Sequence, residues 1–416
     1  MGLPDVRSVR TALHRDDLPD DLPEDTAQRA LRRGSPRWQV RSQARDAVRV
    51  GQGPRPRGEH AAAAQDVARG DHAHAPARQQ RTQGRFVLVE PDQWSRPADA
   101  GRLAGGLGME DFGGLLADRR RPIVTAEFPS LDGGDLDTVA AALEHYRPYV
   151  DAVNITDNPA AHAHASNVSM AIAVKQLGIE PIMQVVCRDK NRLAAQADVV
   201  GASMHGVTTF CALTGDDVTA GDEPEARRVF DLDSPQLISV MNGISRGHYL
   251  SGRELKHPKE LLIGAVENPF APPPEVRVRR AKMKVDAGAR FLQLQIGYEP
   301  DALESFMAGV VANGVAERAA ILPTVILTKS PGALRFMDGQ VPGIHVPAPV
   351  IDRVANADDS AEESYLLVRE QVEHALALPG VAGVHITDFR HDDSLRRLVS
   401  DLALGPAFAP SAAATA

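Results

Sequence analysis

The segment IVTAEFPSLDGGDLDTVAAALEHYRPYVDAVNIT, residues 123–156, determines the fold class. It starts and finishes with short runs of β-branched and apolar residues, Ile123–Phe128 and Ala152–Thr156, which are typical of buried strands. Between them, the apolar residues of Leu136–Leu143 recur at helical spacing. A strand, a helix and a second strand in this order predict two parallel strands joined by a crossover helix.

The same alternation continues along the chain. The runs that we interpret as strands are Ile123–Phe128, Ala152–Thr156, Ile182–Cys187, Val207–Leu213, Leu261–Val266, Phe291–Ile296, Ile321–Leu327 and Val384–Thr387. Eight strand–helix units in roughly 300 residues match the size of a closed barrel better than an open doubly wound sheet. The predicted fold is therefore an α/β, eight-stranded parallel β/α (TIM) barrel. No G-x-G-x-x-G or Walker A sequence opens a helix, which argues against a dinucleotide-binding fold or a P-loop enzyme.

The last helix carries its own boundary signals. Apolar residues recur at helical spacing over Tyr365–Ala375, Ser360 and Glu363 form an S-x-x-E sequence, and Gly380 follows. We therefore expect Ser360 to be the N-cap of a capping box and the helix to end before Gly380.

Composition restricts the class of protein. Of the 416 residues, 43% are hydrophobic and 24% are charged, and the net charge of −9 removes the basic field that non-specific nucleic-acid binding requires. The only cysteines are Cys187 and Cys211, so neither a disulfide framework nor a zinc site is indicated, and both thiols are expected to be buried. No apolar run reaches the roughly 18 residues of a membrane helix and no secretory signal is visible, so we expect a cytoplasmic protein without nucleic-acid or membrane partners.

The N-terminal part of the chain differs in composition from the rest. Residues 1–108 contain 18 Arg and 14 acidic residues but no Lys, Ile, Tyr, Asn or Cys. With almost no aliphatic periodicity, such a segment cannot bury enough apolar surface to offset chain entropy. For residues 1–108 we predict a disordered extension, or sequence upstream of a true start at Met109. Residues 109–405 are predicted to form a catalytic barrel, and residues 406–416 a disordered tail.

In a β/α barrel, functional residues lie at the C-terminal ends of the strands, where the loops form one mouth. Polar residues at the predicted ends are Glu127, Thr156, Arg188 and Asp189, Thr214–Asp217, Glu267 and Asn268, Gln295, Thr328 and Lys329, and Asp388 with Arg390. Glu127 lies between apolar residues, a setting that raises a carboxyl pKa and suits a general acid. The alternative is a rim carboxylate paired with a nearby Arg.

Asp216 and Gln295 each have two interpretations. Gly215 lets the backbone approach a ligand beside Asp216, and Asp217 can cap the next turn, but Gly-Asp-Asp also forms ordinary turns. Gln295 alternates with Gln293 in an apolar strand, so the two amides face inward and either complete a core network or contact a ligand. No histidines and carboxylates occur at ligand spacing, so no metal site is predicted.

Six short motifs follow one another in a distinctive order and spacing. They are Thr125–Pro129 (TAEFP), Asn154–Thr156 (NIT), Ala212–Asp216 (ALTGD), Lys284–Ala289 (KVDAGA), Phe291–Gln295 (FLQLQ) and Ile321–Pro323 (ILP). Together they resemble the methylenetetrahydrofolate reductase family. The resemblance covers about residues 109–405, essentially one complete catalytic barrel.

This resemblance implies a flavoprotein that binds FAD at the barrel mouth and reduces 5,10-methylenetetrahydrofolate to 5-methyltetrahydrofolate, with NADH or NADPH, in a ping-pong cycle. By the same resemblance, Glu127 is the general acid that protonates the bridging folate nitrogen. Asp216 tunes the flavin and the pterin, and Gln295 orients both nicotinamide and folate. Leu327 and Arg390 are implied as further substrate contacts. The partner is a small-molecule folate, and a homo-oligomer or an electron-donor protein stays open.

Other residues are implied to bind the flavin. They are Thr156, Gln184, Thr214, Gly215, Asp216, Asn268, Arg280 and Lys284. The chain departs from the family pattern at three places, since Thr214 replaces an Arg, Gln184 replaces a His and Met283 replaces a basic residue. Each change removes a charge near the flavin, which leaves both FAD and FMN open.

Other functions stay compatible with the sequence. The same site could run in reverse as a methyltetrahydrofolate oxidase in demethylation. A flavin-free barrel could serve as a binding or scaffold subunit, although the retained Glu127, Asp216 and Gln295 argue against it. A metal-dependent hydrolase should present at least two His at strand ends, whereas His385 precedes the end of its strand.

Overall fold

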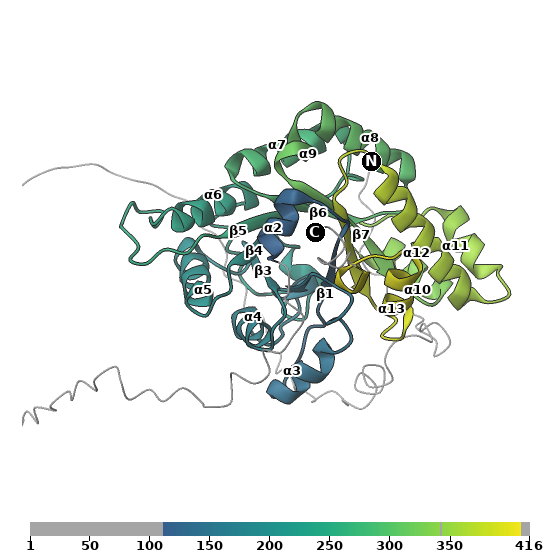
Figure 1. Cartoon of the computed structure of the whole chain (residues 1–416), viewed down its shortest axis with the longest axis horizontal. Coiled ribbons are helices and arrows are strands. Elements are labelled where there is room, and N and C mark those ends of the chain that lie inside the picture. The colour runs from purple at the N-terminus through teal and green to yellow at the C-terminus, as the bar shows by residue number, and fades with distance from the viewer. Residues whose placement is uncertain (1–110, 342, 409–416) are drawn as a thin grey trace, which may run out of the picture. The chain divides into compact units, whose positions relative to one another are not determined.

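All eight predicted runs form strands of one closed parallel barrel. The computed structural model describes residues 111–341 and 343–408. Its strands are β1 (Ile123–Glu127), β2 (Ala152–Ile155), β3 (Pro181–Val186), β4 (Thr209–Leu213), β5 (Leu262–Glu267), β6 (Phe291–Ile296), β7 (Ala320–Leu327) and β8 (Gly383–Asp388). Each strand pairs in parallel with the next and β8 pairs with β1, so the sheet closes (Figure 1). The predicted TIM barrel is confirmed.

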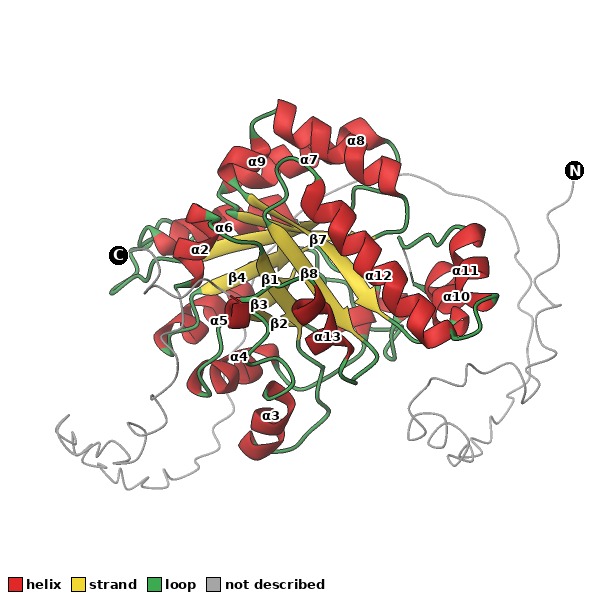
Figure 2. Cartoon of the chain, turned by 45° about the vertical axis from the view of Figure 1, so that its right-hand side comes forward, coloured by secondary structure: helices red, strands yellow, loops and turns green. Residues whose placement is uncertain are grey.

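Helices surround the sheet and connect successive strands (Figure 2). The α-helices are α2 (Phe112–Asp118), α3 (Leu136–Leu143), α4 (Asn167–Gln176), α5 (Arg192–Met204), α6 (Ser234–Ser245), α7 (Pro274–Ala287), α8 (Pro300–Ala312), α9 (Val315–Arg318), α10 (Pro331–Gln340), α11 (Ala348–Ala355), α12 (Ser360–Ala377) and α13 (Ser394–Asp401). Short 3₁₀ turns are η2 (Pro159–Ala161), η3 (Val218–Ala220) and η4 (Pro406–Phe408).

The main apolar core lies between the strands and the helices. Val124 and Ala126 of β1, for example, belong to the same buried cluster as Val139 and Leu143 of α3. The strand residues that alternate with these outward-facing ones point toward the barrel axis. Because both faces of the parallel sheet are covered, the strands are nearly continuous apolar runs, and this is the signal that made them predictable.

Helix α2 closes the N-terminal end of the barrel. Its side chains Phe112, Leu115 and Leu116 are buried together with inward-facing residues at the strand starts, including Ile123 and Phe291. The rings of Phe112 and Phe291 meet edge to face, with centroids 6.5 Å apart. With this end plugged by apolar side chains, a polar ligand can reach the barrel interior only from the C-terminal mouth.

The predicted helix boundary at Ser360 is wrong by one residue. The helix itself is present, and Asp359 is its N-cap, because its carboxylate accepts hydrogen bonds from the N–H groups of Ala361 and Glu362. The Ser360 hydroxyl instead donates to the Val354 carbonyl oxygen, at 2.9 Å. An Asp immediately before the predicted cap offers a charged acceptor to the helix N-terminus, and it takes the capping position.

The remaining sequence expectations fall partly outside the described residues. The predicted extension, 1–108, lies outside them entirely. Of the predicted tail, residues 406–408 form η4 and residues 409–416 lie outside. Cys187 and Cys211 are buried free thiols, as predicted. Within residues 111–341 and 343–408, no helix has the length and apolarity needed to cross a membrane.

Candidate functional site

The C-terminal mouth of the barrel contains a cavity of about 420 Å³. The predicted site residues that line it are Glu127, Thr156, Gln184, Thr214, Gly215, Asp216, Asn268, Arg280, Lys284 and Gln295. They come from the ends of strands β1 to β6 and from α7, so barrel closure alone brings them together. Two predicted residues, Leu327 and Arg390, do not line this cavity.

Glu127 presents its carboxyl to this cavity from the last position of β1. Burial raises the pKa of Glu127 to about 7. Among the described residues, no Lys, Arg or His forms an ion pair with it, so this part of the chain supplies no Arg partner for a rim carboxylate. A carboxyl with this pKa is protonated in a large fraction of molecules at neutral pH and can donate a proton.

A buried polar network forms the floor below Glu127. The side-chain amides of Asn154 and Gln293 bond to each other reciprocally, at 2.7 and 3.0 Å. Nδ1 of His385 is 2.9 Å from the Thr125 hydroxyl and 3.3 Å from Nε2 of Gln293. Burial lowers the pKa of His385 to about 3, so its ring is neutral. Of the two interpretations for the glutamines, Gln293 thus belongs to a core network.

Gln295 reaches the cavity through a break in the β6–β7 pairing. Gln293 pairs with Leu322 but Ile296 pairs with Thr324, so β6 contains one extra residue there. The opposing residue is Pro323, which has no N–H to donate to the ladder. The Thr324 hydroxyl donates to the Leu294 carbonyl oxygen instead. This β-bulge separates Gln295 from the floor network and places it in the cavity wall.

Asp216 follows a glycine whose conformation the site requires. Gly215 has φ of +92°, and a Cβ there would lie 2.7 Å from Cγ1 of Val186. Only glycine therefore fits, and the backbone beside Asp216 stays open to the cavity. Asp217 caps η3 by accepting from the Thr219 N–H at 2.9 Å, as predicted, and pairs with Arg228. Asp216 itself makes no ion pair within the described part of the chain, so its carboxylate is available to a ligand.

One face of α7 makes a basic wall, since Arg277, Arg280 and Lys284 follow at intervals of three and four residues and all line the cavity. Lys284 is buried and its Nζ lies 2.6 Å from Oε2 of Glu267. Desolvation lowers the pKa of Lys284 despite that carboxylate. Arg277 and Arg280 lie farther from Glu267, at 3.8 and 3.9 Å. Three cations facing one buried carboxylate leave positive charge available to an anionic ligand.

Polar contacts hold several other predicted residues in place. The hydroxyl of Thr156 is 2.9 Å from that of Ser130, and the hydroxyl of Thr214 donates to that of Ser234 at 3.2 Å. Nδ2 of Asn268 donates to the carbonyl oxygen of Gly343. Met283 is 49% exposed and does not line the cavity, so its replacement of a basic residue leaves the basic wall intact.

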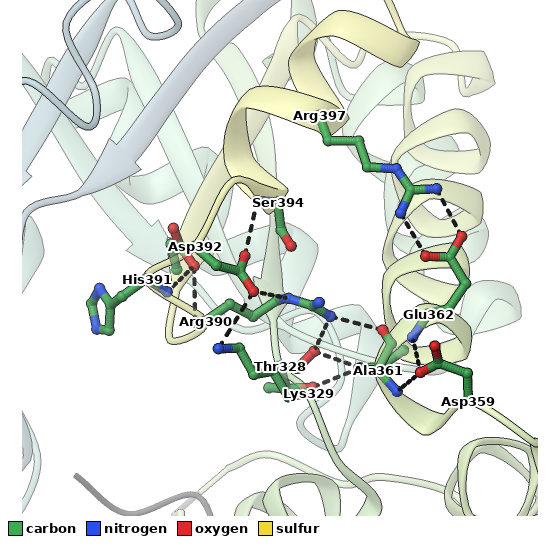
Figure 3. Close-up of polar contacts among 12 residues, drawn as sticks. Thr328, Lys329, Asp359, Ala361, Glu362, Arg390, His391, Asp392, Ser394 and Arg397 are labelled. Atoms are coloured by element: carbon green, nitrogen blue, oxygen red, sulfur yellow. Dashed lines mark hydrogen bonds and ion pairs between the residues drawn. The ribbon is translucent and has the colours of Figure 1, made fainter.

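Leu327 and Arg390 have contacts elsewhere. Leu327 is fully buried in the apolar layer between strands and helices. Nη1 of Arg390 donates to the carbonyl oxygens of Thr328 and Ala361, at 3.0 and 2.8 Å, and its Nε lies 3.3 Å from Asp392 (Figure 3). The Arg390 guanidinium thus ties β7, α12 and the loop after β8 together, which leaves it little capacity to bind a substrate.

Sequence reasoning missed several residues that line the cavity. Arg277 adds a cation, and Asn154 and His385 contribute polar groups from mid-strand, whereas Arg188 was noted at the end of its strand without an assigned role. The spacing of Arg277 before Arg280 and Lys284 was a usable signal for a shared helix face. Asn154 and His385 lay inside apolar runs, and only the closed barrel shows that they meet. Among the described residues, no group of three or more His, Cys, Asp or Glu is arranged to hold a metal ion.

Comparisons with known proteins agree with this architecture. The family model described as methylenetetrahydrofolate reductase matches residues 119–403. A protein from Clostridium thermocellum, described as uncharacterized and binding two copies of 5-methyl-5,6,7,8-tetrahydrofolic acid, has a TM-score of 0.51 and 14% sequence identity, with 70% of this chain and 98% of that chain covered. EDTA monooxygenase from Chelativorans sp. BNC1 has a TM-score of 0.45 and 10% identity, with 70% and 97% covered.

No curated protein matches the chain. The Clostridium thermocellum protein shares the barrel fold, and the match to the family spans more than half of the sequence. The chain belongs to the methylenetetrahydrofolate reductase family.

Proposed function

We propose that this protein is a flavin-dependent reductase that converts 5,10-methylenetetrahydrofolate to 5-methyltetrahydrofolate with NADH or NADPH. The observation that carries the proposal is Glu127, a carboxyl with a pKa of about 7 and no ion-pair partner among residues 111–341 and 343–408, which lines the cavity of a barrel from this family. Opening the five-membered ring of the substrate needs a proton on the bridging folate nitrogen, and Glu127 is suited to supply it.

The proposed role of Glu127 is to donate its proton to the bridging nitrogen of the folate. The carbon–nitrogen bond then breaks, and the methylene carbon becomes part of a cationic iminium that can accept hydride. Asp216, whose carboxylate has no ion-pair partner in the described chain, would stabilise the positive charge that develops on the pterin. The Gln295 amide would hydrogen-bond whichever substrate occupies the cavity.

The residues at the mouth fit a flavin. The Arg280 guanidinium lies 3.9 Å from the Glu267 carboxylate, which leaves donors available to the phosphates of FAD or FMN, and Arg277, whose Nε and Nη2 donate to the carbonyl oxygens of Ala271 and Pro272, adds positive charge. Gly215 lines the cavity with backbone alone, which a flat ring could contact. When bound, the flavin would take hydride from the nicotinamide and pass it to the folate. Both substrates would then use the cavity in turn, as a ping-pong cycle requires.

A folate ligand for this fold has support from one structural neighbour. The Clostridium thermocellum protein is described as binding 5-methyl-5,6,7,8-tetrahydrofolic acid, which is the product of the reaction proposed for this chain. Reverse operation, oxidation of methyltetrahydrofolate, would use the same residues. A flavin-free folate-binding barrel is the second candidate, because Thr214 and Gln184, which the family resemblance implies as flavin contacts, are uncharged and line the cavity.

The substitution Glu127→Gln tests the proposal. It should slow reduction of methylenetetrahydrofolate by about 10²- to 10⁴-fold, the usual contribution of a general acid, because glutamine cannot supply the proton. Flavin reduction by NAD(P)H should stay near the wild-type rate, since that step needs no proton from Glu127. Stopped-flow absorbance separates the two half-reactions, and Glu144→Gln, an exposed carboxyl away from the cavity, is the matched control.

Equal loss in both half-reactions would exclude the general-acid role. The absorption spectrum of the purified wild-type protein addresses the cofactor directly. A protein that binds methyltetrahydrofolate but shows no flavin bands, even after incubation with FAD or FMN, would support the flavin-free candidate.

A further inference from the structure

A second cavity, of about 320 Å³, lies on the outer side of the barrel wall. It is bounded by β6 and β7, the β5–α7 loop, and helices α8, α11 and α12. Leu294, Gln295 and Thr324 line both this outer cavity and the substrate cavity in the mouth. The bulge in β6 is therefore a shared wall, with one side facing each space.

The outer cavity forms because the strand pairing beside it is interrupted and some of its lining side chains are small. Pro323 and the bulge interrupt the strand pairing on its inner side, and Gly297 and Ala375 contribute little side-chain volume. Protein interiors are close-packed and rarely leave such a space, and an apolar cavity of roughly 150 Å³ is enough to bind benzene. The outer cavity has room for a larger ring.

The walls and the rim of the outer cavity differ in polarity. Leu303, Val325 and Leu367 are buried and give apolar walls from three elements. The ionisable residues of the lining are Glu299, Glu370 and His374, and Nε2 of His374 lies 3.6 Å from Glu304. Arg353, the cation that pairs with Glu370 at 2.6 Å, also pairs with Glu363 at 2.5 Å.

Glu299, by contrast, makes no ion pair or side-chain hydrogen bond within the described residues. An apolar chamber beside an unpaired carboxylate favours a flat apolar group that carries a positive charge and disfavours an anion. We propose that the outer cavity binds a small planar aromatic amine, with its ring against the apolar walls and its ammonium group toward Glu299.

Occupancy of the outer cavity should alter folate binding, because Gln295 belongs to the shared wall. This coupling rests on the proposed function, whereas amine binding itself does not. A ligand that packs on one side of the bulge changes the freedom of Gln295 on the other side, and linkage requires the effect to be reciprocal. The bulge would thus both place Gln295 in the substrate cavity and couple this cavity to the outer one.

Isothermal titration calorimetry with tryptamine and indole-3-acetate tests amine binding on the full chain. Tryptamine should bind saturably, and indole-3-acetate, which has the same ring and the opposite charge, at least about tenfold more weakly. Val350→Trp should fill the outer cavity from α11 and abolish tryptamine binding. Ile351→Trp is the matched control, since Ile351 is also half-buried on α11 but does not line the outer cavity.

No saturable tryptamine binding to the wild type would overturn the proposal, as would equal binding to both tryptophan variants. Equal affinity for the two indoles would overturn the charge assignment. Should Val350→Trp fail to fold, Glu299→Gln provides the second variant, and it should reduce the preference for tryptamine over indole-3-acetate.

The coupling is measured separately, as the affinity for 5-methyltetrahydrofolate with and without saturating tryptamine. A change of about fivefold or more, absent in Val350→Trp, is expected for a typical coupling between sites. An unchanged folate affinity would overturn the coupling. A chain that binds tryptamine but no folate would contradict the proposed function while leaving the outer cavity as an amine site.

Discussion

Burial gives Glu127 a pKa of about 7 in the folded chain, whereas its ordinary value is 4.5. The difference links catalysis to stability, because the folded state holds a proton that the unfolded state has already released between these two values. Stability contributed by the protonated form is fully present below pH 4.5 and is lost as the pH rises toward 7. The same desolvation that makes Glu127 a proton donor therefore makes the folded chain less stable at neutral and alkaline pH.

Glu127→Gln should consequently stabilise the protein relative to wild type at pH 8, by about 3 kcal/mol at most, and should have little effect at pH 4.5. Glutamine occupies nearly the same volume and carries no ionisable group. Urea unfolding of both proteins between pH 4.5 and 8 measures the difference. A difference that stays constant over this range would mean that Glu127 has an ordinary pKa.

Gln293 and Gln295 show why two residues of the same type and strand differ in role. Gln293 is 2% exposed and bonds to Asn154 and His385, whereas Gln295 is half-buried in the cavity wall. Their alternation in FLQLQ predicts that both amides point inward, and this much follows from the sequence. The bulge that separates them depends on a proline in the next strand, which alternation within β6 does not reveal.

Gln293→Ala should destabilise the fold by about 1–3 kcal/mol, because it leaves the buried amide of Asn154 without its partner. Gln295→Ala should cost about 0.5–1.5 kcal/mol, because Oε1 of Gln295 accepts from the Ile296 N–H at 2.9 Å, and it should slow both half-reactions, since it removes a group that both substrates would use. Thermal unfolding and stopped-flow rates give the two quantities. Wild-type rates for Gln295→Ala would remove it from the proposed binding role.

At the level of elements, the β6 bulge is held by a substitute hydrogen bond. Pro323 has no N–H to donate to the β6–β7 pairing. Beside it, the Thr324 hydroxyl donates to the Leu294 carbonyl oxygen. This contact and the hydrogen bond from the Ile296 N–H to Oε1 of Gln295, at 2.9 Å, fix the backbone of the bulge. The shape of the bulge therefore depends on the side chain of Thr324, which has no proposed catalytic role.

Thr324→Val keeps the side-chain shape but removes the donor, and should cost about 0.5–1.5 kcal/mol of stability and slow turnover by loosening Gln295. Thr324→Ser keeps the hydroxyl and should restore most of the turnover. Denaturant midpoints and steady-state rates of the pair test this. If serine were as impaired as valine, packing of the methyl group rather than the hydrogen bond would hold the bulge.

Strands and helices were predictable to different degrees. All eight strands were found from apolar runs because a parallel sheet is buried on both faces, and their ends differed by one or two residues. The cap of α12 was misplaced, because Asp359 and Ser360 are both good N-cap residues and only the backbone geometry distinguishes them. Arg390 lay correctly after β8, but contacts with Thr328 and Ala361, distant in sequence, direct its side chain away from the cavity.

For the whole molecule, closure of the barrel sets both the fold and the site. The cavity takes residues from all eight strands and from α7, and α2 seals the opposite end. Besides the pairing of β8 with β1, a side-chain ion pair crosses the seam where the last strand meets the first unit. Nε2 of His145, just after α3, lies 2.6 Å from Oδ2 of Asp388, the last residue of β8. Oδ1 of the same carboxylate accepts from the N–H groups of Arg390 and His391.

The hydrogen bond to Asp388 raises the pKa of His145 above its usual 6.5. Stability from the protonated pair is therefore fully present below pH 6.5 and is lost as the pH rises through the folded-state pKa. His145→Gln should destabilise the chain more at pH 6 than at pH 9. Asp388 keeps its two backbone donors in the variant, so the seam should still close. Urea midpoints of both proteins at the two pH values measure the difference, and an equal difference at both would show that the histidine contributes only as a neutral hydrogen-bond partner.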